Sequence, residues 1–448
     1  MSATSPTAQL VDQDHLPPSW TVAQVDEVGR VQMGRQRSPE FQSGRFTKPY
    51  LRAANILDGR IDTTDVLSMD FDPSDFQSFK LRDRDVLIVE GGTVGRSAVY
   101  RGTIPDVCFQ NTVIRFQVNE RLTCPEFADY LFRHYFYRGG FKDVARQTTI
   151  AHLGLTRFAK MPFILPPLPE QRRIVEAIET NFARLVVAVE RLTQAMQTLG
   201  RLRESVLHDA FDNGWPEATV GEVTDAKISQ EGPCPLGSFS YVDISSVDNL
   251  TKRITAPKSL LAFEAPSRAR QNLKAGDVLI SLTRPNLNAV AIVPRSLHGA
   301  VGSTGFCVLR SREIDPRWLY YLVQTPEFIR TMSNKVLGVL YPAIRPRDIH
   351  SYPLPVPPLT EQRGIVEEVE RNLSVIDEIA SEGNAWLSRS VQLRQSILKA
   401  AFEGRLVPQD PFDEPASVLL EHIKRERSSP KHVPAARRSK SVAPGAAS

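Results

Sequence analysis

The stretch LPPLPEQRRIVEAIE at Leu165–Glu179 returns as VPPLTEQRGIVEEVE at Val356–Glu370, displaced by 191 positions. Between Pro166–Ile178 and Pro357–Val369, 9 of 13 residues are identical. A second stretch, LRESVLHDAF at Leu202–Phe211, returns as LRQSILKAAF at the same displacement. Two matches at one displacement predict a duplicated architecture, and this duplication constrains the fold more than any single residue does.

Length and composition indicate a folded protein of two to three domains, because 448 residues exceed one ordinary core. No apolar run reaches the ~18 residues that span a bilayer, and the first residues carry no secretory signal. The four cysteines lack ligand-like spacing, so we expect neither a metal site nor a disulfide framework, and a cytoplasmic location. From Lys424 onward there are seven Lys or Arg and one acid, which predicts a basic disordered tail.

After each proline block the apolar residues change to a spacing of four and three, which is typical of a coiled-coil helix. Pro169 and Glu170 suit the first turn of a helix. A helix over Glu170–Phe211 would be roughly 63 Å long. In the second copy Gly383 falls on the apolar seam, and we expect a local kink or loosened turn there.

Upstream of each helix, short runs rich in Val, Ile, Phe and Tyr predict a β-rich globular domain. The predicted fold is α+β, with two pseudo-symmetric β-rich domains separated by two long antiparallel coiled-coil helices. Antiparallel packing follows because each isolated amphipathic helix would leave its apolar stripe in water. The predicted boundaries are 1–19 for an N-terminal extension, 20–165 for the first domain, 166–213 for the first helix, 214–356 for the second domain, 357–404 for the second helix and 405–448 for the C-terminal segment and tail.

Two similar but non-identical domains at a fixed separation suit the reading of two short patterns with a fixed gap. A rod of about 60 Å covers roughly 18 base pairs of B-DNA. The separation would set the gap, as dimer geometry sets half-site spacing in two-fold DNA-binding proteins. Because the two domains differ in sequence, we expect two different half-sites.

The chain resembles the specificity (S) subunits of type I restriction–modification systems over almost its whole length. The resemblance is carried by PPLPEQRRIVEAIE and PPLTEQRGIVEEVE, and by LRESVLHDAF and LRQSILKAAFEGRLVPQDP at the helix ends. It implies that each domain is a target recognition domain for one part of a bipartite, asymmetric DNA sequence. It also implies that the paired helices are a spacer and a docking surface for two modification (M) subunits.

The same resemblance implies that this chain is non-catalytic and that the partners of the complex carry the chemistry. S-adenosylmethionine would be held by the M subunits, which methylate adenine, and ATP and Mg by the restriction (R) subunits. The sequence agrees, since it contains no GxxxxGK[ST] loop and no Asp/Asn-Pro-Pro-aromatic tetrapeptide. The expected partners are therefore double-stranded DNA, two M subunits and R subunits, with no membrane.

Candidate DNA contacts are polar side chains in loops, because Arg reads guanine and Asn or Gln reads adenine in the major groove. Each candidate has an equally plain alternative as a solvated loop, a turn or a joint between domain and helix. In the first domain the candidates are Arg35, Arg37, Arg45, Lys48, Thr93, Arg96, Arg146, Gln147 and Thr149. In the second they are Arg284, Asn286, Asn288, Lys335, Tyr341, Arg345 and Arg347.

Two further sets of residues lie on the helices. The candidates for docking of partner subunits are Glu170, Gln171, Arg172, Glu361, Gln362 and Arg363, which could equally be first-turn caps. Arg203 and Arg394 interrupt the apolar seam at equivalent positions. Each could fix the register of the coiled coil or reach out to water.

Two other functions remain open at this stage. One is a specificity subunit of an orphan DNA methyltransferase or another phage-defence complex without restriction. The other, from a different class, is a two-headed adaptor that binds proteins through both domains. A salt-sensitive shift of DNA by the complex with M subunits would argue against the adaptor.

Overall fold

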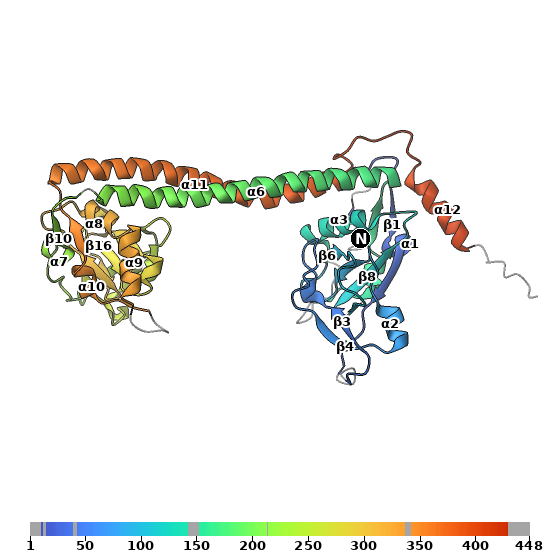
Figure 1. Cartoon of the computed structure of the whole chain (residues 1–448), viewed down its shortest axis with the longest axis horizontal. Coiled ribbons are helices and arrows are strands. Elements are labelled where there is room, and N and C mark those ends of the chain that lie inside the picture. The colour runs from blue at the N-terminus through green and yellow to red at the C-terminus, as the bar shows by residue number, and fades with distance from the viewer. Residues whose placement is uncertain are drawn as a thin grey trace, which may run out of the picture. The chain divides into compact units, whose positions relative to one another are not determined.

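The structure is a computed structural model that describes residues 10–11, 15–38, 43–141, 152–212, 214–336 and 342–428. It divides into two compact units. Unit 1 comprises Met1–Ala188 and Ser388–Ser448, and unit 2 comprises Val189–Leu387. Each contains one β-rich domain and segments of two long helices (Figure 1). Within the described ranges, no helix is both long and apolar enough to cross a membrane.

The domain of unit 1 contains short strands and small helices. Its strands are β1 (Thr21–Gln24), β2 (Gly29–Met33), β3 (Thr47–Leu51), β4 (Leu67–Asp70), β5 (Val86–Val89), β6 (Ser97–Val99), β7 (Cys108–Phe109), β8 (Val113–Val118) and β9 (Pro162–Leu165). Its helices are α1 (Val25–Val28), η4 (Ala53–Asn55), α2 (Pro73–Phe79), α3 (Pro125–Tyr137) and α5 (Leu155–Ala159). The sheet orders are β2-β8-β5-β6, β4-β3-β7 and β1-β9.

The core of unit 1 lies between the four-stranded sheet and α3. All four residues of β5 are buried, as expected for a central strand whose two faces are both covered. Phe116 of β8 and Phe132 of α3 pack edge to face with ring centroids 5.7 Å apart. The same core includes Ile174 and Phe402, which belong to the two long helices.

The domain of unit 2 repeats this plan with different details. Its strands are β10 (Glu217–Thr219), β11 (Ser238–Val242), β12 (Val247–Asp248), β13 (Arg253–Ile254), β14 (Lys258–Leu261), β15 (Ala269–Asn272), β16 (Val278–Ser281), β17 (Val290–Ile292), β18 (Val301–Ser303), β19 (Phe306–Leu309) and β20 (Pro353–Pro355). Its helices are α7 (Val220–Val223), η5 (Ile244–Ser246), η6 (Ala262–Glu264), η7 (Pro285–Leu287), η8 (Arg295–Leu297), α8 (Pro316–Leu322), α9 (Pro326–Asn334) and α10 (Pro346–His350).

Strand pairing shows that the two domains share a common core of strands, although β2 of unit 1 and β15 of unit 2 have no counterpart among the described strands of the other unit. The sheets of unit 2 are ordered β17-β16-β19, β14-β11-β18-β15, β10-β20 and β12-β13. The parallel pair β3–β7 of unit 1 corresponds to the parallel pair β11–β18 of unit 2. The antiparallel pair β1–β9 corresponds to β10–β20, and each pair closes its domain just before a long helix. The pseudo-symmetric α+β fold predicted from the repeat is therefore confirmed.

The two long helices begin and end at equivalent residues. Helix α6 covers Leu168–Phe211 and α11 covers Leu359–Phe402, each 44 residues long and displaced by 191. They lie side by side and antiparallel within each unit (Figure 1). In unit 2 the end of α6 packs on the start of α11 through Leu207, Val369 and Leu373. In unit 1 the start of α6 packs on the end of α11 through Ile178 and Leu398.

One detail of the helix seam differs from expectation. Helix α11 continues through Gly383 without interruption, so the loosened turn predicted there is wrong. A Cβ at Gly383 would lie 2.5 Å from the sulfur of Met196, and the glycine therefore serves close helix packing instead. The seam arginines bind across the helix pair. Arg203 donates to Asp377 at 2.5 Å in unit 2, and the Arg394 guanidinium lies 5.3 Å from the centre of the Phe182 ring in unit 1.

Beyond α11 the chain folds back onto unit 1. Helix α12 (Ala416–Ser428) buries Ala416, Leu420 and Ile423 in the core of that unit. Its Lys424 pairs with Glu27 at 2.6 Å. The C-terminal segment thus completes unit 1 as far as Ser428. The disordered tail predicted from Lys424 onward is wrong for residues 424–428, which belong to α12, and the rest of it lies outside the described residues.

Candidate nucleic-acid interface

In unit 1 backbone hydrogen bonds link residues at the edges of the three predicted loops. The amide of Asn111 donates to the carbonyl of Arg35 at 2.9 Å, and the amide of Glu90 donates to Thr112 at 2.9 Å. Glu90 in turn accepts from the amide of Leu153 at 3.0 Å, and its carboxylate lies 2.9 Å from Nδ1 of His152. Residues 111–112 therefore contact the edges of the first two loops, and Glu90 contacts the residues that follow the third, although these segments are far apart in sequence.

Unit 2 shows the same meeting of loops. Thr283, just after β16, forms an antiparallel bridge with Ala343, at the position equivalent to the Gly91–His152 bridge of unit 1. The amide of Arg284 donates to the carbonyl of Pro342 at 2.8 Å. Two loops that the sequence predicted separately therefore form one surface. Arg284 and Asn288 have positive φ angles of 49° and 46°, so the intervening turn has a defined shape.

Many of the candidate side chains are exposed to solvent at these loops. The exposed set comprises Arg37, Arg45, Thr93, Arg284, Asn286, Lys335, Arg345 and Arg347. Lys48 is half-buried and pairs with Asp106 at 3.2 Å, and Arg96 is also half-buried. Four candidates, Arg146, Gln147, Thr149 and Tyr341, lie outside the described residues.

Two candidates turn inward, which corrects the sequence-based expectation for them. The Arg35 guanidinium, only 12% exposed, donates to the carbonyl of Asp70 at 2.7 Å and pairs with Asp75 at 2.5 Å. The Asn288 amide donates to the carbonyl of Val323 at 2.8 Å, and the backbone carbonyl of Asn288 accepts from Lys252 at 2.6 Å. Both side chains bind neighbouring segments of their own domain and hold loops in place.

Asp70 is a further residue of this surface, and the sequence analysis did not identify it. One carboxylate oxygen accepts from the Ser43 hydroxyl at 2.6 Å and the Gly44 amide at 2.8 Å. The other accepts from the Phe46 amide at 3.2 Å and the Thr47 hydroxyl at 3.0 Å. The Ser43 hydrogen bond, which outweighs the opposing effect of burial, lowers the pKa of Asp70 to about 2. The resulting stabilisation is present above the unfolded pKa of ~3.9 and is lost as pH falls toward 2.

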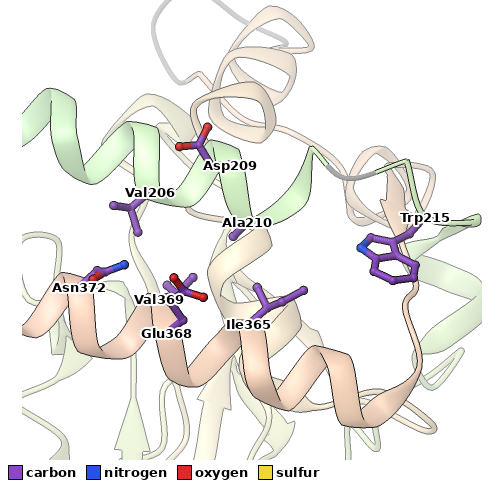
Figure 2. Close-up of a pocket in the computed structure, with 8 residues that line it drawn as sticks. All are labelled: Val206, Asp209, Ala210, Trp215, Ile365, Glu368, Val369 and Asn372. Carbon is purple, nitrogen blue, oxygen red and sulfur yellow. The ribbon is translucent and has the colours of Figure 1, made fainter.

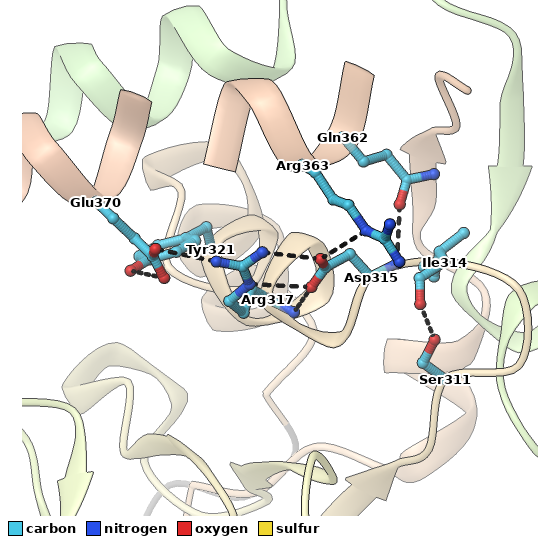
Figure 3. A network of polar contacts seen from close by, with 8 residues as sticks. All are labelled: Ser311, Ile314, Asp315, Arg317, Tyr321, Gln362, Arg363 and Glu370. Carbon is cyan, nitrogen blue, oxygen red and sulfur yellow. Dashed lines mark hydrogen bonds and ion pairs between the residues drawn. The ribbon is translucent and has the colours of Figure 1, made fainter. Parts of the chain in front are cut away.

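A second set of contacts joins each domain to its long helix. The Gln171 side chain is fully buried, donates to the carbonyl of Pro166 at 2.9 Å and accepts from the Thr123 hydroxyl at 2.7 Å. The Gln362 side chain donates to the carbonyl of Pro357 at 2.8 Å and accepts from the amide of Asp315 at 2.9 Å (Figure 3). Each glutamine thus ties the first turn of a long helix to the start of the domain helix, α3 or α8.

The charged groups around the two glutamines differ between the units. In unit 2, Arg317 pairs with Asp315 at 3.0 Å and with Glu370 at 3.1 Å (Figure 3). Burial raises the pKa of Asp315, but hydrogen bonds from Arg317 outweigh it and lower that pKa overall. In unit 1 the ion pair is instead Arg101 with Glu126, at 2.8 Å. The buried amide joint is common to both units, whereas the surrounding ion pairs are not.

These contacts decide which predicted docking residues remain available. Glu170, Gln171 and Gln362 are each at most 1% exposed, so docking of a partner on them is wrong for the folded chain. Glu170 accepts from the Gln409 amide at 2.6 Å, and burial raises its pKa. Arg172, Glu361 and Arg363 are exposed and remain candidates.

Replacing Gln362 with alanine should destabilise unit 2 by about 1–3 kcal/mol, because the amide of Asp315 and the carbonyl of Pro357 would lose their partner in the interior. Hydrogen exchange measured on peptides covering the start of α11 would detect the change. Arg363→Ala is the control, because this exposed side chain makes only a 4.0 Å ion pair with Asp315, and the variant should stay within about 1 kcal/mol of the native chain. Equal losses of stability in the two variants would contradict the role of Gln362 as the buried link between the domain and α11.

The paired helices carry a cavity and exposed apolar side chains. In unit 2 a cavity of about 510 Å³ lies between the end of α6 and the start of α11 (Figure 2). Its lining includes Val206, Asp209 and Ala210 of α6 and Ile365 and Glu368 of α11. Several large apolar side chains of the helices are also exposed. They are Val186, Val187, Val391 and Leu393 in unit 1, and Leu202, Val375, Ile379 and Trp386 in unit 2.

Comparison with known proteins defines the class to which these features belong. Residues 17–191 match the family model described as the type I restriction modification DNA specificity domain. The specificity subunit of the type I restriction enzyme StySPI from Salmonella potsdam is 25% identical, over 93% of this chain and 97% of that protein. The match thus extends through both repeats.

Solved structures share the fold. A chain from a study of complex assembly and conformational transition of the type I restriction–modification system aligns with a TM-score of 0.69 and 22% identity, covering 87% of this chain and 99% of that chain. The HsdS subunit from Thermoanaerobacter tengcongensis aligns with a TM-score of 0.55 and 21% identity, covering 87% and 98%. The chain is thus similar to type I restriction–modification specificity subunits over most of its length, and it contains their DNA specificity domain at residues 17–191.

Proposed function

We propose that this chain reads a bipartite, asymmetric DNA sequence, with one half-site for each unit, and that it docks M subunits on its paired helices. The observation that carries the proposal is a repeated scaffold with non-repeated loops. Gln171 and Gln362 form the same joint at a displacement of 191, while the exposed loop residues around Arg45 and Arg284 have no such correspondence. A common scaffold with different contact residues is what two different half-sites require.

The chemistry of the exposed loop residues supports DNA as the ligand. Arg284 and Asn286 project from a turn of defined shape, and both residue types can form paired hydrogen bonds with base edges. Arg345 and Arg347 lie on the adjoining segment that pairs with Thr283 through Ala343, and they suit contacts with phosphate. Base reading and backbone positioning would thus come from neighbouring loops.

The exposed apolar side chains of α6 and α11 support the docking of protein partners. The proposed partners are two M subunits, which would hold S-adenosylmethionine and methylate adenine, and R subunits, which would use ATP and Mg. This chain would perform no covalent step. Among the described residues, no group of three or more His, Cys, Asp or Glu side chains is arranged to hold a metal ion.

The proposal predicts that M subunits alone bind DNA without sequence preference and gain a preference of at least ~1,000-fold over random sequence when this chain is added. Competition binding at a stated salt concentration would measure the ratio, and mapping of methylated adenines would give both half-sites and the gap. Methylation of the same sites by M subunits without this chain would contradict the proposal. So would a continuous target without a gap of fixed length.

A further inference from the structure

The loop of unit 1 that carries Arg37 and Arg45 is closed at its base by one acidic residue. Asp70, at the end of β4, is only 7% exposed. Its carboxylate takes the four hydrogen bonds from Ser43 to Thr47 described above, while its backbone carbonyl accepts from Arg35. Asp70 therefore binds both ends of the loop: Arg35 before it and the segment from Ser43 to Thr47 after it. Residues 39–42 between these points lie outside the described residues.

The donors on this carboxylate are themselves surface residues. Ser43, Gly44, Arg45 and Thr47 are exposed, and Phe46 is 47% exposed. Their bonds to Asp70 therefore contribute little to the hydrophobic core of unit 1, but they restrict the backbone from which the Arg45 side chain projects. A loop held in its binding conformation loses less entropy when it meets a ligand.

The equivalent loop of unit 2 has the same backbone hydrogen bond as this one but lacks the carboxylate. In unit 1 the Phe71 amide donates to the carbonyl of Phe46 at 2.9 Å. Asp70 pairs with Thr47 in the β3–β4 register, and Leu261 pairs with Ser238 in the equivalent β11–β14 register. Leu261 has no side-chain acceptor, and the base of that loop is closed by the Ala262 amide donating to the carbonyl of Gly237 at 3.0 Å. Hydrogen bonding of this loop to a carboxylate at the end of the adjacent strand is therefore specific to unit 1.

We propose that Asp70 is a positioning residue for the half-site read by unit 1, and that it acts through the exposed side chains of its loop, Arg45 in particular. This inference rests on the proposed function, and it names one residue that sets the specificity of one half-site. Asp70 touches no DNA itself. Its effect is to present Arg45 in a fixed direction.

The test uses the full chain assembled with M subunits and a DNA containing the mapped target. Asp70→Asn keeps the shape of the side chain but puts an NH₂ group in front of two donors. We expect about 10-fold weaker binding to the target and faster amide exchange at residues 44–47. Arg45→Ala should cost about the same in the native chain and nothing further in the Asp70→Asn background. A loss of stability alone would not produce this non-additivity.

Asp62→Asn is the matched control, because Asp62 is an acceptor for the amide and hydroxyl of Thr64 in a different loop of unit 1, at 3.0 Å and 2.8 Å. It should leave binding unchanged. If Asp70→Asn does not fold, the double variant Ser43→Ala and Thr47→Val removes the two hydroxyl donors and should show the same non-additivity with Arg45→Ala.

Native binding by the Asp70→Asn complex, despite faster exchange at residues 44–47, would overturn the inference and leave the proposed function intact. Additive losses for Asp70→Asn and Arg45→Ala would overturn it too. A native complex without any sequence preference would instead overturn the proposed function, and this inference with it. Relaxed discrimination at only one half-site, the one that Arg45→Ala also affects, would support it.

Discussion

Replacing Trp318 with alanine is expected to lower the free energy of unfolding of unit 2 by about 3–5 kcal/mol. Trp318 of α8 is fully buried, and its ring centroid lies 4.4 Å from that of Phe211, the last residue of α6. Its indole N–H donates to the carbonyl of Pro355 at 2.9 Å, four residues before α11 begins. Removal of the side chain therefore leaves a cavity where the domain meets both long helices.

Unit 1 supplies the control for this prediction. Phe127, at the position equivalent to Trp318, packs against Phe402 with ring centroids 5.4 Å apart. Trp318→Phe would reproduce that arrangement and lose the hydrogen bond and part of the volume, so we expect a smaller cost of about 1–3 kcal/mol. Hydrogen exchange of β16 and β5 amides would report the two units separately. A loss of protection at β5 as large as at β16 would contradict a joint confined to unit 2.

Removing the side chains of Arg284 and Asn286 together is expected to abolish discrimination at one half-site and preserve it at the other. Each well-formed contact to a base edge contributes about 1–3 kcal/mol of discrimination, or roughly 10- to 100-fold. Both residues are exposed, so the double alanine variant should fold normally. Mapping of methylated adenines by the complex would show which bases of the target have become degenerate.

Arg295→Ala provides a matched control for charge in the same domain. Arg295 is exposed on η8, beyond the end of β17 that is remote from the loop of residues 282–288. It should weaken binding little and leave both half-sites unchanged. Arg45→Ala should reduce base discrimination at one half-site, and the Arg284 and Asn286 double variant should reduce it at the other. If the Arg45 variant and the Arg284 and Asn286 variant lost discrimination at the same bases, the assignment of one half-site to each unit would be wrong.

The long helices could be predicted closely from the sequence because their signal is periodic and occurs twice. The seam positions from Leu185 to Leu199 are less exposed than their neighbours, as the alternating spacing indicates, whereas near the end of α6 Leu207 is more buried than Val206. Gly383 shows the limit of this reasoning. Helix propensity alone favours a loosened turn at glycine, but tertiary packing against Met196 overrides it.

For the candidate interface, the sequence predicts which loop residues are polar but not which of them contact residues that are distant in sequence. Exposed loop positions such as Arg45 and Arg284 were identified from turn composition. Arg35 was assigned to DNA because nothing nearby in the sequence reveals that Asp70 and Asp75, 35 and 40 residues away, hold its guanidinium. The same reason explains why Gln171, next to exposed Arg172, was not recognised as a buried joint.

The division of the core between distant parts of the chain has a consequence for synthesis. Residues 189–387 form unit 2 as one continuous block, whereas the core of unit 1 also needs Leu398, Phe402 and Leu420. On a translating ribosome, unit 2 can therefore be complete while unit 1, made first, still exposes apolar surface. A polypeptide released before α12 is synthesised could therefore contain a folded unit 2 and an incompletely packed unit 1. Unit 1 can complete its core only after the ribosome has translated α12.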